Sequence, residues 1–205
     1  MNILRTFFFA FLLVLAFSFD GSAQTREKDK EFDKEPSRIG FGVNLGNIRF
    51  YNSSFEFGIA PNVAYRVSES FAVGFMLKAD YFYKKYRSQG VKFSAFDLGP
   101  TVFARVKPLW NWENATPFLK GIFIQAEYEK GFLKRAYENQ FGEAILDTEG
   151  EIEVANIKED FLYVGLGASS GYPFSTFVSI HYNVLDDFDS VRFPFAYRIG
   201  FTWNY

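Results

Sequence analysis

The last thirteen residues alternate without a break between two kinds of side chain. The apolar positions share one parity, and they are Phe193, Phe195, Tyr197, Ile199, Phe201, Trp203 and Tyr205. The small or polar positions share the other, and they are Pro194, Ala196, Arg198, Gly200, Thr202 and Asn204. Because a β-strand sends successive side chains to opposite faces, this segment predicts a strand with one wholly apolar face. Such a strand fits a soluble sandwich with the apolar face inward, or a membrane barrel with that face toward lipid.

The same two-residue period recurs from residue 38 onward. It predicts eight strands, at 38–49, 55–67, 71–86, 92–106, 116–133, 160–172, 175–186 and 193–205. Pro61 and Pro100 each remove a ladder donor inside a strand, which predicts bulges or bends at those positions. Four phenylalanines fall on polar faces and need pockets there: Phe93, Phe103, Phe123 and Phe177.

Aromatic residues dominate the composition, with 28 Phe, 12 Tyr and 3 Trp among 205 residues. Membrane barrels use such residues in girdles at the interface between lipid and water. The net charge of −2 argues against a nucleic-acid-binding surface, so no nucleic-acid partner is expected. The absence of Cys excludes disulfides, thiol catalysis and a lipid anchor on a Cys.

The N-terminus has the features of an export signal. Arg5 precedes a 13-residue apolar stretch at 7–19, and Gly21 and Ala23 are small residues in front of Gln24. Because a spanning helix needs ~20 apolar residues, we expect cleavage after Ala23 rather than a membrane anchor. The chain then divides into a signal peptide (1–23), a disordered charged segment (24–37) and a barrel domain (38–205).

Three features favour a membrane barrel over a secreted sandwich or a lipocalin-like barrel. The apolar faces are unbroken over six or seven residues in several strands, and the opposite faces are rich in Gly, which suits a narrow lumen. Aromatic residues gather at the predicted strand ends: Tyr81, Tyr83, Tyr86, Tyr128 and Phe132 at one rim, and Tyr65, Phe118, Tyr172, Trp203 and Tyr205 at the other. The third feature is a near balance of inward charges, as an enclosed network requires.

The balanced charges define a predicted lumen network. Its cations are Arg38, Arg66, Lys78, Lys84, Arg105 and Arg198, and its anions are Glu56, Asp80, Asp97, Glu127 and Glu129. His181 shares the inward parity and joins them. Since eight strands leave an interior that side chains can fill, we expect these groups to plug the lumen in hydrogen-bonded pairs.

The longest connection, 134–159, joins the fifth and sixth strands and is strongly acidic. If the N-terminus is periplasmic, this connection faces outside, where long loops are usual. Alternation at 144–146 and 152–154 predicts a hairpin that extends the two strands and offers an edge to a partner protein. A calcium site is the alternative to a solvated acidic loop, but no calcium-loop spacing fits.

The C-terminus resembles the insertion signal of bacterial outer-membrane proteins, with Arg198, Gly200, Trp203 and Tyr205 at the matching positions. With the export signal and strand pattern, the chain resembles small barrels of the OmpA/OmpX-type superfamily and outer-membrane β-barrel domain proteins of Bacteroidota. The resemblance implies an all-β, eight-stranded antiparallel up-and-down transmembrane barrel in the outer membrane, with a periplasmic N-terminus. It also implies contact with outer-membrane lipid and lipopolysaccharide, and insertion by the barrel-assembly machinery.

Some small barrels of this class are lipid A palmitoyltransferases or deacylases that use a His with a Ser and an acid. His181 has Ser179 and Asn183 on its face, and Glu127 or Asp80 could reach it across the lumen. The simpler interpretation is a polar member of the lumen network, so no catalytic, cofactor or metal site is expected. Three functions stay open: a structural or adhesive barrel acting through 134–159, an accessory subunit of an envelope transport or secretion complex, and a lipid A-modifying enzyme centred on His181.

Overall fold

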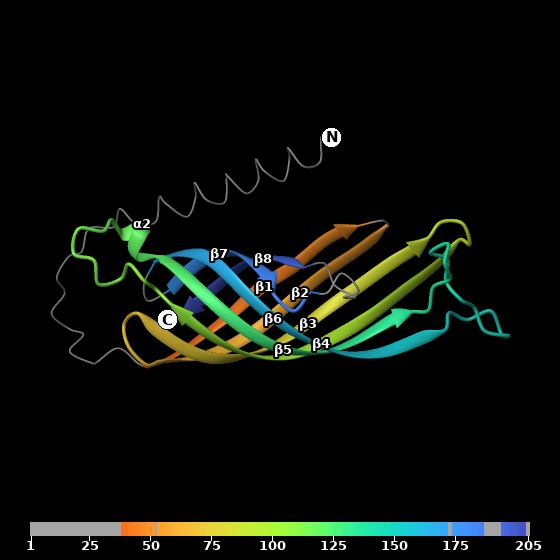
Figure 1. Cartoon of the computed structure of the whole chain (residues 1–205), viewed down its shortest axis with the longest axis horizontal. Coiled ribbons are helices and arrows are strands. Elements are labelled where there is room, and N and C mark those ends of the chain that lie inside the picture. The colour runs from red at the N-terminus through yellow and green to blue at the C-terminus, as the bar shows by residue number, and fades with distance from the viewer. Residues whose placement is uncertain (1–37, 52, 172–173, 187–193, 204–205) are drawn as a thin grey trace, which may run out of the picture.

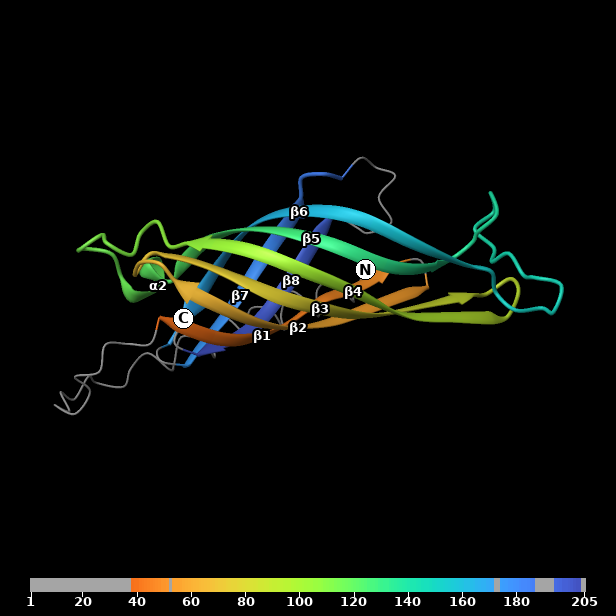
Figure 2. The ribbon, with the colours of Figure 1, turned by 90° about the horizontal axis from the view of Figure 1, so that it is seen from below.

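Eight antiparallel strands close into one barrel in chain order (Figure 1; Figure 2). The computed structural model describes residues 38–51, 53–171, 174–186 and 194–203. The strands are β1 (Ile39–Tyr51), β2 (Ser54–Arg66), β3 (Phe71–Tyr86), β4 (Val91–Val106), β5 (Ile122–Ala136), β6 (Val154–Ser170), β7 (Phe174–Asn183) and β8 (Phe195–Trp203). β1 pairs with β8 and closes the barrel, with Phe41 opposite Trp203. The predicted eight-stranded up-and-down fold is confirmed, whereas the predicted signal peptide and charged segment lie outside the described residues.

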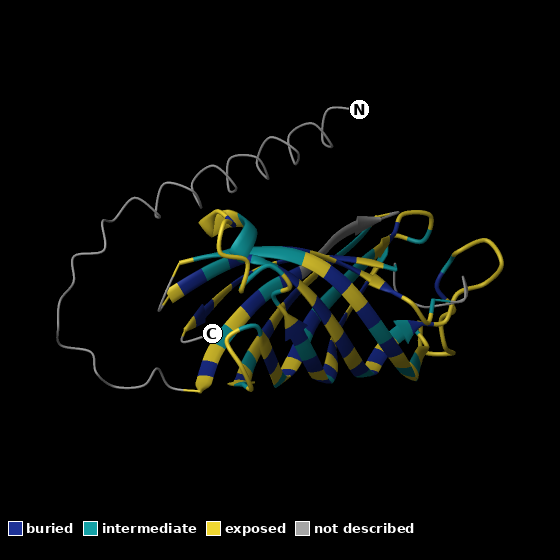
Figure 3. Cartoon of the chain, turned by 60° about the vertical axis from the view of Figure 1, so that its left-hand side comes forward, coloured by how far each residue is buried: buried dark blue, intermediate teal, exposed yellow. Residues whose placement is uncertain are grey.

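Burial alternates residue by residue along the strands, as the banding in Figure 3 shows. On β8 the odd-numbered residues from Phe195 to Trp203 are exposed and the even-numbered ones between them are buried. The exposed positions of all eight strands form an apolar belt, which includes Phe41, Val43, Ile59, Val63, Phe75, Leu77, Leu98, Val102, Ile124, Tyr128, Val164, Leu166, Ile180, Tyr182, Tyr197 and Ile199. The buried positions include charged side chains such as Asp97 and Glu129, both 0% exposed. This distribution is the reverse of that in a soluble sandwich, where the apolar side faces the core.

The start of β5 differs from the sequence prediction. Residues 117–120 form a single-turn helix, α2 (Pro117–Lys120), instead of strand. Thr116 caps it, since its hydroxyl accepts a hydrogen bond from the Leu119 amide at 3.4 Å, and Pro117 occupies the first turn. The prediction of a strand from 116, with Phe118 and Lys120 in it, is therefore wrong. Among the described residues, no helix is long and apolar enough to cross a membrane.

The two strand prolines do not produce bulges. β2 and β3 keep one register on both sides of Pro61, with Ile59 opposite Ala79 and Asn62 opposite Met76. β4 and β5 likewise keep one register across Pro100. A register shift does occur in β1, between Gly46 and Arg49. The predicted bulges at Pro61 and Pro100 are thus wrong.

Strands β3 to β6 continue beyond the closed barrel at one end, which lies to the right in Figure 1. The β6–β7 ladder ends at Tyr163 opposite Asn183, whereas the β5–β6 ladder continues to Ala136 opposite Val154. The β4–β5 ladder ends at Leu98 opposite Phe132, so β3–β4 and β5–β6 continue as two separate ribbons, and β2 stays paired with the first of them as far as Lys84. We call this the extended end, and the end that carries α2 the helix end. Beyond the β5–β6 ladder, isolated bridges join Glu138 to Ala144 and Leu146 to Ile152, so the connection forms short pairs of its own. The second pair lies within the alternating segments (144–146 and 152–154) from which a hairpin was predicted.

Candidate functional site

The interior of the barrel is layered, and the inward-facing residues of β5 follow the layers in order. From the helix end they are Phe123, Gln125, Glu127, Glu129, Gly131 and Leu133. Phe123 meets Phe177 edge-on at the helix end, with ring centroids 5.9 Å apart. Toward the extended end, Leu133 packs in an apolar cluster with Phe161, Tyr163 and Ala196. The polar and charged groups of β5 therefore lie between two apolar layers.

The central layer is an ionic network that spans the lumen. Lys78 on β3 places its Nζ 3.0 Å from Glu127 Oε2 and 2.7 Å from Glu129 Oε2. Arg198 on β8 donates from Nη1 to Glu127 Oε1. All four side chains are at most 3% exposed. Two carboxylates thus face two cations, which offsets the large cost of removing each charge from water.

Gln125 connects this network to the aromatic layer of Phe123 and Phe177 at the helix end. It accepts a hydrogen bond from Arg105 Nε at 2.6 Å and donates one from Nε2 to Glu127 Oε1 at 2.6 Å. The Arg105 guanidinium lies 4.0 Å from the ring centroid of Phe123 and 4.9 Å from that of Phe177. The positive charge is therefore held both by an amide oxygen and by two aromatic faces.

His181 lies next to the ionic network, in contact with Ser179. Its Nε2 is 3.0 Å from Ser179 Oγ, and its Nδ1 is 3.6 Å from Glu127 Oε1. The ring covers Gly165 on β6, where an added Cβ would lie 2.3 Å from Nδ1. His181 and Glu127 are each 1% exposed, and Ser179 is 9% exposed. A serine, a histidine and a carboxylate thus contact one another in a row, but all three are buried inside the barrel.

The other predicted network residues occupy several environments. Glu56 and Asp80 are buried on β2 and β3, and Arg66 is half-buried at the helix end. Arg38 keeps the inward parity but is exposed beside β1, where its Nη1 lies 3.5 Å from the Tyr65 hydroxyl. It therefore lies apart from the central ionic layer.

Two predicted residues bind partners at the extended end. Asp97 accepts hydrogen bonds from the Lys134 amide at 2.9 Å and from Arg135 Nη1 at 2.7 Å, so it joins the two ribbons where their ladder stops. Lys84 Nζ binds both carboxylate oxygens of Glu138, at 2.7 and 2.8 Å. Both partners, Arg135 and Glu138, belong to the segment that the sequence analysis assigned to a loop.

Several interior residues are absent from the predicted lumen network. Gln125, Phe161 and Tyr163 share the inward parity of β5 and β6, and each is at most 2% exposed. Parity alone would have identified them, but they were not selected because they are uncharged. Arg135 was missed because the predicted strand ended at 133, three residues before the end of β5 at Ala136. Tyr86 was predicted in an aromatic rim, but it is buried and donates its hydroxyl to Glu138 at 2.8 Å.

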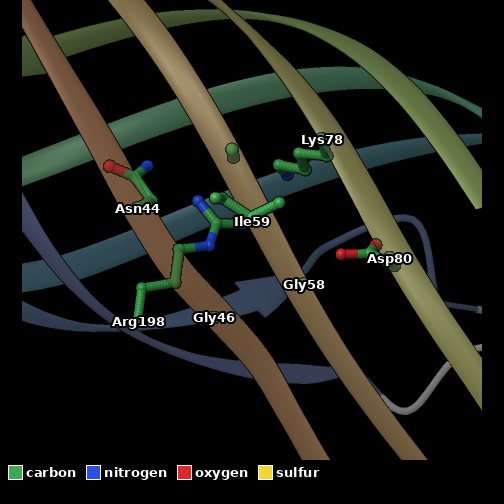
Figure 4. Close-up of a pocket in the computed structure, with 8 residues that line it drawn as sticks. Asn44, Gly46, Gly58, Ile59, Lys78, Asp80 and Arg198 are labelled. Atoms are coloured by element: carbon green, nitrogen blue, oxygen red, sulfur yellow. The ribbon is translucent and has the colours of Figure 1, made fainter.

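A small cavity opens beside the ionic network (Figure 4). It is lined by Asn44, Gly46, Gly58, Ile59, Ala60, Lys78, Asp80 and Arg198. Its volume holds about one water molecule. Within the described part of the chain, the buried Nη2 of Arg198 has no hydrogen-bond partner. The cavity is therefore suited to hydrating this guanidinium and is too small for an organic ligand.

The hairpin at the extended end is fastened to the β3–β4 ribbon. Gln89, in the β3–β4 turn, donates to the Ala144 carbonyl at 2.9 Å and accepts from the Ala144 amide at 2.8 Å. Ala144 and Ile152 pack in a cluster with Ala136 of β5 and with inward residues of the ribbon, which are Phe82, Tyr86, Val91, Phe93 and Ala95. The connection is thus a folded unit with a defined outer surface.

That outer surface combines negative charge with exposed apolar groups. Residues 137–153 contain six acids and no Lys or Arg; the acids are Glu138, Glu143, Asp147, Glu149, Glu151 and Glu153. Phe141 at its turn is 78% exposed, and Tyr137 is 50% exposed. The Tyr137 amide donates a hydrogen bond to the Glu153 carbonyl, and the Ile145 amide donates one to the Tyr137 carbonyl. These bonds place the segments around residues 137, 145 and 153 side by side. We call this unit the acidic hairpin (137–153).

Lys107 marks the helix end, just after β4. It is largely buried, and its Nζ lies 5.2 Å from the Trp110 ring centroid. Burial, together with the nearby positive charges of Arg105 and Arg66, lowers the pKa of Lys107 from 10.5 to about 8. Cations therefore gather at this mouth of the barrel.

The residues of the predicted insertion signal lie on both faces of β8. Arg198 points into the ionic network, and Gly200 faces the Phe177 ring, which an added Cβ would approach to 2.4 Å. Trp203 is exposed on the outer face. Tyr205 lies outside the described residues.

Comparison with known proteins finds similarity to solved structures of outer-membrane proteins. No protein-family model matches the chain, and no curated protein matches its sequence. Among solved structures, the outer membrane protein Ail of Yersinia pestis, in a phospholipid bilayer nanodisc, is 14% identical, with 80% of this chain and 97% of that chain covered and a TM-score of 0.42. The β domain of the Bordetella autotransporter BrkA is 10% identical, with 82% and 100% covered and a TM-score of 0.27. Similarity at this level says nothing about ligands or partners.

Proposed function

We propose that this chain is an integral outer-membrane barrel, not an enzyme, that presents the acidic hairpin to a partner outside the cell. The observation that carries the location is the apolar belt around a charged interior. Phe41, Phe96 and Trp203 are each at least 60% exposed, whereas Lys78 and Glu127 are at most 2% exposed. A continuous exposed apolar surface of this extent is unfavourable in water and favourable in lipid.

Migration on a gel tests the location. A closed barrel extracted from membranes stays compact in detergent until it is boiled, so the unboiled protein should migrate faster. Protein expressed with its native leader should fractionate with the outer membrane. A mature protein that stays monomeric and soluble without any amphiphile would contradict the proposal.

The layered interior supports a lumen closed to diffusion. The charged network is covered by Phe123 and Phe177 on one side and by Leu133 and Phe161 on the other. We expect the purified protein in planar bilayers to give no stable conductance steps. Steady ohmic conductance from the monomer would rule out a plugged lumen while leaving the membrane location intact.

The acidic hairpin is the surface that best fits a protein partner. It carries negative charge beside Tyr137 and Phe141, so it suits a partner with cationic and apolar groups. Because the Tyr137 amide already bonds to the Glu153 carbonyl at 2.9 Å, residues 138–152 can be replaced by an Asn-Gly turn without separating β5 from β6. The shortened protein should insert normally and lose partner binding.

A matched pair of point variants separates the hairpin from general stickiness. Phe141→Ser removes an exposed aromatic group at the extended end, and Trp112→Ser removes one, 53% exposed, at the helix end. Binding of intact cells to candidate partner proteins should fall for Phe141→Ser and stay unchanged for Trp112→Ser. Equal binding by all three proteins would refute a role for the hairpin. Labelling of a Cys placed at 141 on intact cells checks that this end faces outward.

A second candidate, acyl transfer or hydrolysis on lipid A, is favoured by the contacts of His181 with Ser179 and Glu127. Against it, Lys78 and Arg198 already hold Glu127, and the layers above and below leave the serine enclosed. A working site must open toward its substrate. Mass spectrometry of lipid A from cells with the native protein or Ser179→Ala decides the matter, since a difference between the two would establish the activity.

A further inference from the structure

The outward faces of β3 to β6 change character where the strands leave the apolar belt. Five lysines occupy outward positions there: Lys85, Lys92, Lys130, Lys134 and Lys158. The one acid among them is Asp160, which binds Lys130 Nζ at 2.7 Å and the Tyr128 hydroxyl at 3.1 Å. The charge of Lys130 is therefore already compensated. The other four lysine side chains have no carboxylate partner among the described residues, and we call them the lysine face.

The arrangement of the lysine face is unfavourable for the protein alone. Lys85 and Lys92 are directly opposite one another in the β3–β4 ladder. Like charges at such a position repel and destabilise a sheet. On the other ribbon, Lys134 stands opposite Asn156 and Lys158 opposite Phe132, so neither has an acid as its cross-strand neighbour. An anionic ligand would relieve this repulsion.

The level of the lysine face along the barrel indicates the ligand. Tyr83 precedes Lys85 by one outward position, and Phe132 lies between Lys130 and Lys134, so aromatic groups of the belt meet the lysines. Aromatic side chains at the end of a lipid-facing belt lie at the level of lipid headgroups. The lysines next to them are at the level of headgroup phosphates.

We propose that the lysine face binds the phosphate groups of a phosphorylated glycolipid, of the lipid A type, in the outer leaflet. The proposal rests on the membrane location and orientation proposed above, but not on any partner of the acidic hairpin. The same phosphates repel the six acids of that hairpin, so the two charged surfaces together would hold the hairpin away from the membrane surface. At the extended end, the lysine face would thus attract the phosphates, and the acidic hairpin beyond it would be repelled by them.

Binding to labelled lipid tests the proposal. The full-length protein is folded in neutral detergent and titrated with fluorescent bis-phosphorylated lipid A, with dephosphorylated lipid A and with inorganic phosphate as separate arms. A lysine near an anionic surface contributes roughly fivefold in affinity, so Lys85→Gln/Lys92→Gln should weaken binding of the phosphorylated lipid about tenfold or more. Binding should also weaken as salt is raised from 50 to 300 mM, because exposed charges are screened.

Lys107→Gln/Lys120→Gln is the matched control, since it removes two lysines at the helix end. It should change lipid affinity by less than about twofold. Equal loss in both double variants, or equal binding of dephosphorylated lipid A, would overturn the proposal. Displacement of the lipid by millimolar inorganic phosphate would also overturn it, because it would show a free-phosphate site. Rapid migration on unboiled gels establishes that each variant is folded, so a loss of lipid binding is separable from a loss of the barrel.

Discussion

Lys78 Nζ lies between Glu127 and Glu129, 3.0 Å from one carboxylate and 2.7 Å from the other. The lysine comes from β3 and the two acids from β5, so the ion pairs pass over the inner face of β4, the strand between them. With the Arg198 guanidinium, this ammonium group compensates two carboxylates that are buried two positions apart on the same strand.

Replacement of Lys78 by Met should therefore destabilise the barrel strongly. It removes the cation that Glu127 and Glu129 share, and breaking such a buried network costs about 3–5 kcal/mol. Urea-induced unfolding in phospholipid vesicles, followed by Trp fluorescence, measures the change. Lys92→Met, at an exposed outward position, is the control and should cost less than about 0.5 kcal/mol. Similar losses in both variants would mean that the interior network contributes little.

Gly165 and His181 form a steric pair that a double-mutant cycle can test. A Cβ at Gly165 would lie 2.3 Å from His181 Nδ1, so Gly165→Ala should destabilise by about 1–3 kcal/mol. Gly165→Ala/His181→Ala should recover most of that loss, because the clashing ring is gone. Additive losses in the same vesicle unfolding measurement would show that the ring does not contact the glycine.

The stability of the barrel should rise with pH above 8 because of Lys107. Its pKa in the folded protein is lowered from 10.5 to about 8, so the unfolded chain binds the proton more tightly. The unfolding free energy therefore increases between pH 8 and 10.5, by roughly 1–3 kcal/mol in total, and gains nothing from this group below pH 8. Lys107→Met should flatten this part of the pH profile, whereas Lys92→Met should leave it unchanged.

Loss of the Gln89 side chain should loosen the acidic hairpin without harming the barrel. Gln89→Ala removes two hydrogen bonds to Ala144, each worth about 1 kcal/mol. A glutamyl endopeptidase should cleave after Glu143 and the other glutamates of the acidic hairpin roughly fivefold faster or more, because local opening of the hairpin becomes easier. Ser88→Ala, in the same turn, is the control. Unchanged cleavage in Gln89→Ala would show that the packing of Ala144 and Ile152 alone holds the hairpin.

Alternation predicted the barrel well because each strand has one face that lipid or water selects and one that the lumen selects. On β8 every described residue lies on the expected face. The burial of Lys78, Arg105 and Glu127 followed from parity as well. What parity could not give is partner choice, since that depends on the register between strands. The central role of Gln125 and the link from Asp97 to Arg135 arise from register and were not predicted.

The missed elements have local causes. Residues 116–120 were included in a strand although Lys120 falls on its apolar parity. Thr116 and Pro117 together are a helix start, and this signal prevails over the alternation that follows. The prolines at 61 and 100 cost ladder bonds without shifting register, since the bonds on either side fix the pairing. The fold was thus more predictable than the details of its interior, where a few contacts across the lumen decide the geometry.

The pairing of β1 with β8 brings position 41 against position 203. Every other ladder joins strands that follow one another in the chain, so this seam carries by far the largest loop-closure entropy. Until it forms, two strand edges remain able to pair with other chains. The time spent in that open state, more than the strength of any single contact, would then govern whether a newly made molecule matures or aggregates.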